Sequence, residues 1–258
     1  MPLLLPPRAL KPRSRGLTMI IDRGVPFRNF VDLMESFGDH VDFVKFGWGT
    51  SVVTKNFEWK LNVLRDANID FYLGGTLFEK YVTQDLFDEY RDLCAGYGCR
   101  YVEVSNGTID ISNDEKADYV KRLSDDFQVI SEVGSKDQLT SDLMTPAKWI
   151  SYIQADLDAG AVLVTLETRE GGHGGICRSN GELRYGLIEE ILDSKIDHDR
   201  LLFEAPSTEL QTYFIQRVGS DVNLGNISPS DIVPLETIRL GLRSETLLHF
   251  EHGLRHAI

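Results

Sequence analysis

Eight short apolar runs recur along the chain, and each one ends in polar or glycine residues and is followed by a longer amphipathic stretch. They cover residues 17–22, 41–47, 69–75, 101–107, 128–134, 161–167, 201–205 and 222–227. Strand-like and helix-like segments that alternate in this way are typical of parallel β/α architecture. Eight such units in roughly 240 residues favour a (β/α)8 TIM barrel over an open doubly wound sheet. The sequence therefore predicts an α/β chain with a single barrel domain.

The barrel is expected to span residues 16–258, because no linker or shift in composition divides this part of the chain. Residues 1–15, MPLLLPPRALKPRSR, are expected to form an extended N-terminal arm. Prolines interrupt the leucine run of this arm, so it lacks the unbroken apolar stretch of about 7–15 residues that a signal peptide requires. No run of about 18 apolar residues occurs, and we therefore expect no transmembrane helix.

The chain carries 27 Lys and Arg residues against 40 Asp and Glu residues, a formal net charge of −13. This excess of negative charge argues against a nucleic-acid partner and against docking on anionic lipid. Small anionic substrates remain compatible with it only in a pocket whose local charge opposes that of the whole chain. The cysteines Cys94, Cys99 and Cys177 are odd in number and include no Cys-x-x-Cys pair. This pattern predicts buried reduced thiols and a cytoplasmic location.

Charged and polar side chains gather where the predicted strands end, which is where barrel enzymes present their catalytic groups. They include Lys45, Glu103, Ser105, Asn106, Glu132, Lys136, Glu167, Arg169, Glu204 and Asn226. Side chains alternate between the two faces of a strand, so Glu167 and Arg169 are expected to face the barrel axis. The same rule turns Glu132 and Lys45 toward the axis.

Four of these residues are glutamates expected inside the barrel, where a charge is costly unless it is paired, hydrated or bound to metal. One interpretation is a set of structural ion pairs that closes the top of the barrel. The other is a functional site, because carboxylates at this density commonly hold a hard divalent cation, and Mg2+ prefers oxygen ligands. Basic side chains beside such a cation would then oppose a multiply anionic substrate.

Glycines in the same loops allow backbone N–H groups to approach an anion closely. The segment VNLGNIS, with Gly225 and Asn226 before a predicted helix, fits the phosphate site that such barrels form after their last strands. An ordinary strand-to-helix turn would explain the same residues. Arg239 and Arg243, four residues apart, are expected on one helix face, as an anion-binding pair or as a solvated stripe.

At these strand ends the sequence resembles the phosphosulfolactate synthase family. The matching segments are GLTMIIDRG, VDFVKFGWGTS, YLGGTLFE, YVEVSNGTI, SEVGSK, LETREGGHGGI, LFEAP, VNLGNIS and LETIRLGLRSET. The resemblance implies a Mg2+-dependent carbon–sulfur lyase that joins sulfite to phosphoenolpyruvate and gives (2R)-phospho-3-sulfolactate. It also implies a homo-oligomer, and a product that leads to coenzyme M in methanogens and to sulfolactate in other bacteria.

The resemblance assigns expected roles to the residues at the strand ends. Lys136 resembles the general acid of the family, which protonates C2 of the adduct, and Lys45 is the second candidate catalytic residue. The candidate substrate-binding residues are Arg169, Gly225, Asn226, Ser105 and Asn106. The candidate Mg2+ ligands are Glu103, Glu132 and Glu167. Glu204 is a candidate for orienting a lysine instead.

Two other functions fit the same residues. The first is a Schiff-base lyase on the same barrel, with Lys45 or Lys136 as the amine nucleophile. The second is a non-catalytic relative that acts through protein contacts, because some plant members of the family are heat-stress proteins. A fold alone does not decide among these functions.

Overall fold

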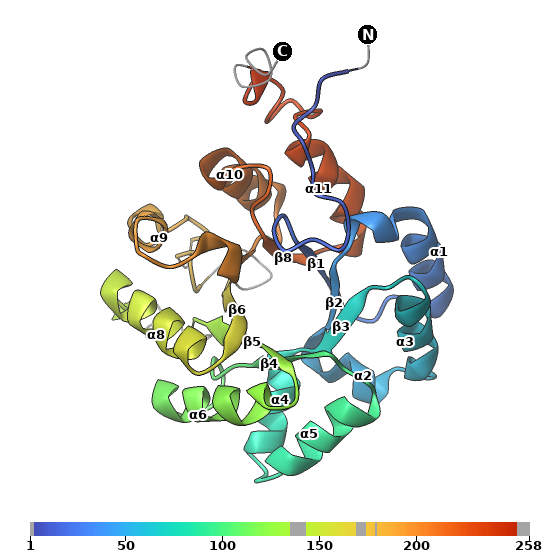
Figure 1. Cartoon of the computed structure of the whole chain (residues 1–258), viewed down its shortest axis with the longest axis vertical. Coiled ribbons are helices and arrows are strands. Elements are labelled where there is room, and N and C mark those ends of the chain that lie inside the picture. The colour runs from blue at the N-terminus through green and yellow to red at the C-terminus, as the bar shows by residue number, and fades with distance from the viewer. Residues whose placement is uncertain (1–2, 135–142, 169–173, 179, 252–258) are drawn as a thin grey trace.

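A computed structural model of the chain describes residues 3–134, 143–168, 174–178 and 180–251. This part of the chain forms a barrel of eight parallel strands surrounded by a ring of helices (Figure 1). Each of the eight predicted runs contains one strand. The strands are β1 (Thr18–Asp22), β2 (Phe43–Phe46), β3 (Asp70–Leu73), β4 (Tyr101–Val104), β5 (Gln128–Val133), β6 (Ala161–Leu166), β7 (Leu201–Glu204) and β8 (Leu224–Ile227).

Neighbouring strands pair in the order β3-β2-β1-β8-β7-β6-β5-β4, so the first and last strands of the chain are hydrogen-bonded to each other. Strands β3 and β4, at the two ends of this order, pack side by side and close the barrel. This arrangement confirms the prediction of a single-domain (β/α)8 TIM barrel.

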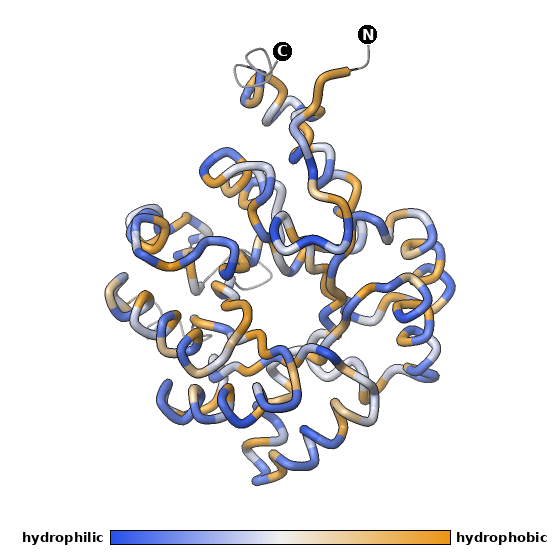
Figure 2. Tube along the Cα trace, viewed as in Figure 1, coloured by the Kyte–Doolittle hydropathy of each residue, from blue (hydrophilic) through white to orange (hydrophobic). Residues whose placement is uncertain are grey.

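The helices cover the outside of the barrel, and hydrophobic and hydrophilic residues alternate along them (Figure 2). They are α1 (Phe27–Phe37), α2 (Thr50–Val53), α3 (Phe57–Asp66), α4 (Gly75–Val82), α5 (Phe87–Gly96), α6 (Asn113–Ser124), α8 (Pro146–Asp158), α9 (Tyr185–Leu192), α10 (Thr208–Val218) and α11 (Ile232–Arg239). Helix α8 illustrates how the local sequence determines where a helix begins and which face it buries. Thr145 caps its N-terminus, Pro146 occupies the first turn, and Trp149 and Ile153 are buried one turn apart.

Two apolar clusters hold these layers together. The larger one lies between the sheet and the helices. The smaller one fills the barrel interior and consists of Leu17, Met19, Phe43, Tyr72, Ile130, Leu163 and Leu202. Its members confirm the predicted alternation, since Phe43, Ile130 and Leu163 are the apolar residues two positions before Lys45, Glu132 and Thr165 on the inward face.

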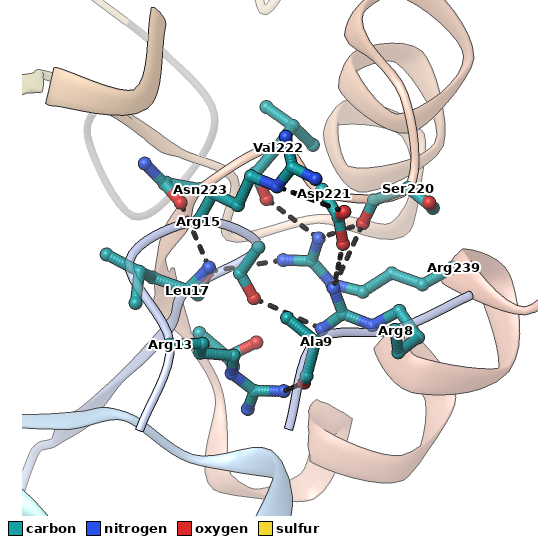
Figure 3. A network of polar contacts seen from close by, with 12 residues as sticks. Arg8, Ala9, Arg13, Arg15, Leu17, Ser220, Asp221, Val222, Asn223 and Arg239 are labelled. Atoms are coloured by element: carbon teal, nitrogen blue, oxygen red, sulfur yellow. Dashed lines mark hydrogen bonds and ion pairs between the residues drawn. The ribbon is translucent and has the colours of Figure 1, made fainter. Parts of the chain in front are cut away.

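The N-terminal arm crosses the end of the barrel at which the strands begin, and it runs beside α11 (Figure 1). The arm is extended, and ion pairs fix it to the barrel. Arg8 binds Asp221 at 2.8 Å and Glu236 at 2.9 Å, and Arg13 binds Asp42 at 2.9 Å. Figure 3 shows Arg8 turned toward Ser220 and Asp221, which precede β8, and Arg13 turned toward Ala9 of the arm itself.

The prediction for Arg239 and Arg243 is wrong. Helix α11 ends at Arg239, so the two arginines do not share a helix face, and Arg243 binds Glu245 at 2.7 Å. The Arg239 side chain is fully buried and donates hydrogen bonds to the carbonyls of Ser220, Val222 and Leu17 (Figure 3). It therefore supports the backbone before β1 and β8 and is not available to an anion.

Two further predictions are answered by the described residues. The three cysteines are unpaired and buried, as expected. Within the described ranges, none of the helices has the length and apolar character needed to cross a membrane.

Candidate active site

A cavity of about 380 Å3 opens at the carboxyl ends of the barrel strands. All eight strands supply a lining residue from their last residues or from the position directly after them. These residues are Ile21, Lys45, Gly74, Glu103, Glu132, Glu167, Glu204 and Asn226. The volume is in the range of small-molecule sites. The strand ends named from the sequence therefore do converge on one cavity.

Lys45 lies at the centre of the charged residues of this cavity. Its Nζ is 2.9 Å from Glu103 Oε1, 3.4 Å from Glu132 Oε2 and 3.5 Å from Glu204 Oε1. All four side chains are buried. One ammonium thus serves three carboxylates, and this cluster, which we call the Lys45 cluster, carries a net negative charge when all four groups are ionised.

Backbone N–H groups also donate hydrogen bonds to two carboxylates of the cluster. Glu103 Oε2 accepts a hydrogen bond from Gly75 N at 2.5 Å, and Glu204 Oε2 accepts one from Thr168 N at 2.8 Å. Gly75 has no space for a side chain, because an added Cβ would lie 2.4 Å from Ser105 Oγ. The close approach of its backbone to Glu103 therefore requires glycine.

The surroundings of these groups shift their pKa values. Burial opposes the charge of Lys45, but the nearby carboxylates of Glu103, Glu132 and Glu204 outweigh it and raise the pKa of Lys45 well above its ordinary value. Burial raises the pKa of Glu204 to about 8, with Lys45 acting against this shift. Burial also raises the pKa of Glu103, again against Lys45. Lys45 is consequently an ammonium at neutral pH.

Glu167 enters the cavity from the residue directly after β6. Its backbone N–H donates to Val133 O at 3.0 Å, which continues the ladder between β5 and β6 by one step. Gly134 makes room for its side chain, since a Cβ at that position would lie 2.5 Å from the Cβ of Glu167. Two predicted metal ligands, Glu132 and Glu167, therefore come from adjacent strand ends.

Ser105 and Asn106 are not among the residues that line the cavity. Ser105 is buried and donates to Glu79 Oε1 at 3.0 Å, and the same oxygen accepts from Thr108 N at 3.1 Å. Asn106 donates to Ile111 O at 3.1 Å. Both residues shape the loop after β4, and Glu79, which the sequence analysis did not select, organises that loop.

Gly225 and Asn226 have different surroundings although they are adjacent. Gly225 packs inside the barrel, where a Cβ would lie 2.8 Å from Met19 Cε, so it makes space for the core. Asn226 lines the cavity in a left-handed backbone conformation with φ 53°. Its buried Oδ1 has no hydrogen-bond partner among the residues that the structure describes. An orphaned oxygen of this kind is a free ligand atom in the cavity.

Lys136 and Arg169 lie outside the described residues, so their predicted roles remain predictions. Trp48 is a lining residue that the sequence analysis missed. Its indole is 53% exposed at the rim, and its backbone is left-handed with φ 53°, an uncommon conformation for a bulky residue. The Gly-Trp-Gly sequence directly after a predicted strand is the signal that could have identified it.

The chemistry of the lining fits a hard divalent cation, because all its candidate ligand atoms are oxygens. They belong to the glutamates and to the orphaned Oδ1 of Asn226. Among the described residues, however, no three Asp, Glu, His or Cys side chains are arranged as a complete metal site. Lys45 occupies the point at which Glu103, Glu132 and Glu204 converge. Both oxygens of Glu103 are engaged, one by Lys45 Nζ and the other by Gly75 N.

A charged cavity at the carboxyl ends of the strands of a (β/α)8 barrel is where barrel enzymes have their active sites. The sequence profile of one family, (2R)-phospho-3-sulfolactate synthase (ComA), matches residues 6–245. The chain belongs to this family, which confirms the resemblance noted in its sequence.

Individual relatives agree with this assignment. The chain is 49% identical over 242 residues to the phosphosulfolactate synthase of Bacillus subtilis (strain 168), covering 94% of this chain and 96% of that protein. It is 42% identical to the phosphosulfolactate synthase of Methanothermobacter thermautotrophicus, covering 95% and 96%. Among solved structures, 3-hexulose-6-phosphate synthase superposes with a TM-score of 0.56 over 87% of this chain and 99% of that one. At 12% identity this last likeness shows the fold alone.

Proposed function

We propose that the protein is a phosphosulfolactate synthase, a carbon–sulfur lyase that adds sulfite to phosphoenolpyruvate and forms (2R)-phospho-3-sulfolactate with Mg2+ as cofactor. One observation carries this proposal. In this member of the family, Lys45 and four buried glutamates line one cavity of about 380 Å3 at the carboxyl ends of the strands. This is an oxygen-rich, charged site suited to small anions and a hard cation.

The reaction is a Michael-type addition. The sulfur of sulfite forms a bond to the methylene carbon of phosphoenolpyruvate, the electrons of the double bond move toward the carboxylate, and a proton is then added at C2. A bound divalent cation would stabilise the negative charge that develops on this carboxylate more than it stabilises the ground state. The cation and Lys45 would also reduce the repulsion between the cavity glutamates and two anionic substrates.

The residues of the chain then take distinct roles. Glu132 and Glu167, with Asn226 Oδ1, are the proposed holders of Mg2+. Lys45 keeps the carboxylates of the Lys45 cluster in a fixed arrangement and presents a positive charge to the cavity. Lys136 is the proposed general acid at C2, and Arg169 is proposed to bind an anionic substrate group.

A Schiff base on Lys45 is disfavoured by the state of this side chain. An imine forms from a neutral amine, and lysines that form one have a lowered pKa. The pKa of Lys45 is raised instead, because three carboxylates surround it. Borohydride in the presence of a carbonyl substrate should therefore leave Lys45 unmodified, and mass spectrometry of its peptide would detect the reduced adduct that the lyase predicts.

One assay tests the proposed function. Phosphoenolpyruvate should disappear on addition of sulfite and Mg2+, and a product with the mass of phosphosulfolactate should replace it in equal amount. Omission of sulfite and replacement of the protein by its Lys45→Met variant are the matched controls. A folded wild-type protein that leaves phosphoenolpyruvate unchanged under these conditions would favour the non-catalytic, heat-stress type of relative.

We propose further that the protein acts as a homo-oligomer in the cytoplasm. Exposed apolar side chains after β2 support an assembly, since Val52 is 68% and Val53 is 82% exposed. Light scattering coupled to size exclusion should give a multiple of 29.1 kDa. A Val53→Asp variant that keeps the wild-type mass would remove this surface from the interface.

A further inference from the structure

The three glutamates of the Lys45 cluster are supported from the outer side of the barrel. In each case a side chain of the surrounding helices donates a hydrogen bond to a backbone carbonyl at the glutamate or next to it. Tyr90 of α5 donates to Glu103 O at 3.3 Å, and Lys116 of α6 donates to Glu132 O at 2.9 Å. Gln211 of α10 donates to Ala205 O, directly after Glu204, at 3.1 Å. All three donors are fully buried.

Lys116 shows why such a donor is needed. Val133 O accepts from Glu167 N and therefore points to β6, so the carbonyl of the preceding residue, Glu132, points to the opposite side, toward β4. The last residue of β4, Val104, is paired with Ser131. Glu132 O consequently lies beyond the end of its neighbouring strand, and the Lys116 ammonium takes the position that a strand N–H would occupy.

The ammonium is itself held in place. It lies 2.7 Å from Asp156 Oδ2 of α8, and the same carboxylate oxygen accepts a hydrogen bond from Ser131. A buried ion pair is weak support for stability, because apolar side chains of similar volume commonly serve as well. An apolar side chain at position 116 could not donate to Glu132 O, and this donation is what distinguishes the ion pair from a packing contact.

We propose that Lys116, with Tyr90 and Gln211 in the equivalent places, is a positioning residue for the reaction. It fixes the backbone of Glu132 from behind and so sets where the Glu132 carboxylate stands relative to Lys45 Nζ, 3.4 Å away. The catalytic part of this inference rests on the proposed function, whereas its geometric part does not. A displacement of about 1 Å in an active site can cost on the order of 100-fold in rate.

The main test is Lys116→Met, with Arg239→Met as the matched control. Arg239 is also a fully buried cation that donates to backbone carbonyls, but it does so at the opposite end of the barrel. Lys116→Met should lower kcat by about 10- to 100-fold and leave KM within about threefold, the usual scale for a residue that orients a functional group. Arg239→Met should lower the melting temperature without changing kcat. Lys116→Arg, which keeps a charged donor, should recover most of the loss in kcat.

A smaller change guards against misfolding. Tyr90→Phe removes one hydroxyl and should lower kcat by about fivefold, the equivalent of one ordinary hydrogen bond. If Lys116→Met does not fold, the double variant Lys116→Met/Asp156→Leu removes the charge left without its partner and takes its place. A crystal structure of the folded variant should show Glu132 Oε2 moved out of hydrogen-bonding distance of Lys45 Nζ.

The measured kcat and the Glu132–Lys45 distance together distinguish a failure of this inference from a failure of the proposed function. An unchanged Glu132–Lys45 distance in the variant would overturn the inference whatever the activity. A changed distance with wild-type kcat would overturn the role in catalysis. A wild-type protein without synthase activity would refute the proposed function, and the distance alone would then decide whether Lys116 positions Glu132.

Discussion

The two ends of the barrel handle charge in opposite ways. Where the strands begin, each buried cation has its own partners, as in the ion pair of Arg13 with Asp42 and in Arg239, which donates to three carbonyls. In the cavity where the strands end, one ammonium, that of Lys45, is shared by three carboxylates. Lys60 and Asp22 form a separate buried pair at the end of β1, outside this cluster. The first arrangement pairs these cations within the protein, although the Nε of Arg239 has no hydrogen-bond partner among the described residues. The second leaves negative charge that a bound cation or a proton must balance.

This difference separates stability from function. Charged groups that are paired within the protein contribute to the free energy of unfolding, and they have no unpaired charge with which to bind a ligand. A cluster with surplus charge costs free energy in the free protein, and ligand binding relieves that cost. Changes at the strand beginnings should therefore affect stability, and changes at the strand ends should affect turnover. Five predictions test this division.

Removal of the divalent cation should have the largest effect. If Mg2+ balances the carboxylates of the mouth, an excess of chelator should abolish turnover, and added Mg2+ should restore it. The melting temperature should fall only by the amount that binding of the cation to the folded protein contributes, and the ion pairs at the strand beginnings should be unaffected. Full activity in chelator would leave Glu132 and Glu167 as ion-pair partners only.

Lys136→Arg should reduce kcat by roughly 100-fold or more, the usual scale of general acid catalysis, while substrate binding is largely kept. Arginine keeps the positive charge but is a very poor proton donor. Lys11→Arg, a change at the opposite end of the barrel, is the control and should keep wild-type kcat. Turnover of Lys136→Arg within a few-fold of wild type would move the acid role to Lys45.

Arg239→Met should lower the free energy of unfolding by about 2–3 kcal/mol, because buried carbonyls lose a charged donor. The carbonyls are those of Ser220, Val222 and Leu17. Denaturant titration would measure the loss, and the kcat of the folded fraction should equal that of the wild type. A fall in kcat at unchanged stability would contradict the division between the two ends.

Arg169→Met should raise KM for phosphoenolpyruvate or sulfite by about tenfold, the equivalent of one lost charge-assisted contact. Arg100→Met is a suitable control, since Arg100 is 68% exposed in its side chain and pairs with Asp70 where β3 begins. The control should keep the wild-type KM. An unchanged KM in Arg169→Met would place this residue outside the substrate site.

Glu236→Gln should have the smallest effect, about 1 kcal/mol at neutral pH. Burial works against the charge of Glu236, but its hydrogen bonds and ion pair with Arg8 lower its pKa below the ordinary value of 4.5. A carboxylate with a lowered pKa stabilises the folded state above its unfolded pKa, and this contribution is lost as the pH falls through its folded pKa. Unfolding measured from pH 7 into acid should therefore show a difference between the variant and the wild type that is full at pH 7 and disappears as the pH falls through the folded pKa. A difference that persists in acid would mean that packing, and not charge, makes the contribution.

The sequence predicted the framework of the mouth well, because alternation along a strand is a local rule. Lys45, Glu132 and Glu167 reach the cavity for that reason. Which side chains pair with one another in the cavity is not determined by a local rule. The arrangement of three carboxylates around one ammonium depends on how β2, β4, β5 and β7 meet in space. The prediction that Glu103 binds a metal could not include Lys45 and Gly75, which engage both oxygens of its carboxylate.

The same limit explains the other differences. Arg239 has the spacing of a surface residue, yet it points under the barrel, where it donates to three backbone carbonyls. Gly225 sits in a loop-like sequence, but the narrow barrel interior beside Met19 requires its small size. Both cases depend on residues about 200 positions away in the chain, with which no pattern within one segment can connect them.

The attachment of the N-terminal arm has a consequence for how the protein is made. The partners of Arg8, Asp221 and Glu236, follow it by 213 and 228 residues. A ribosome that adds 5–20 residues per second needs about 10 to 40 s to travel from one to the other. During this time β1 also lacks β8, its neighbour in the finished sheet. The nascent chain therefore exposes an unpaired strand edge until β8 has been synthesised, and closure of the barrel has to wait for that point.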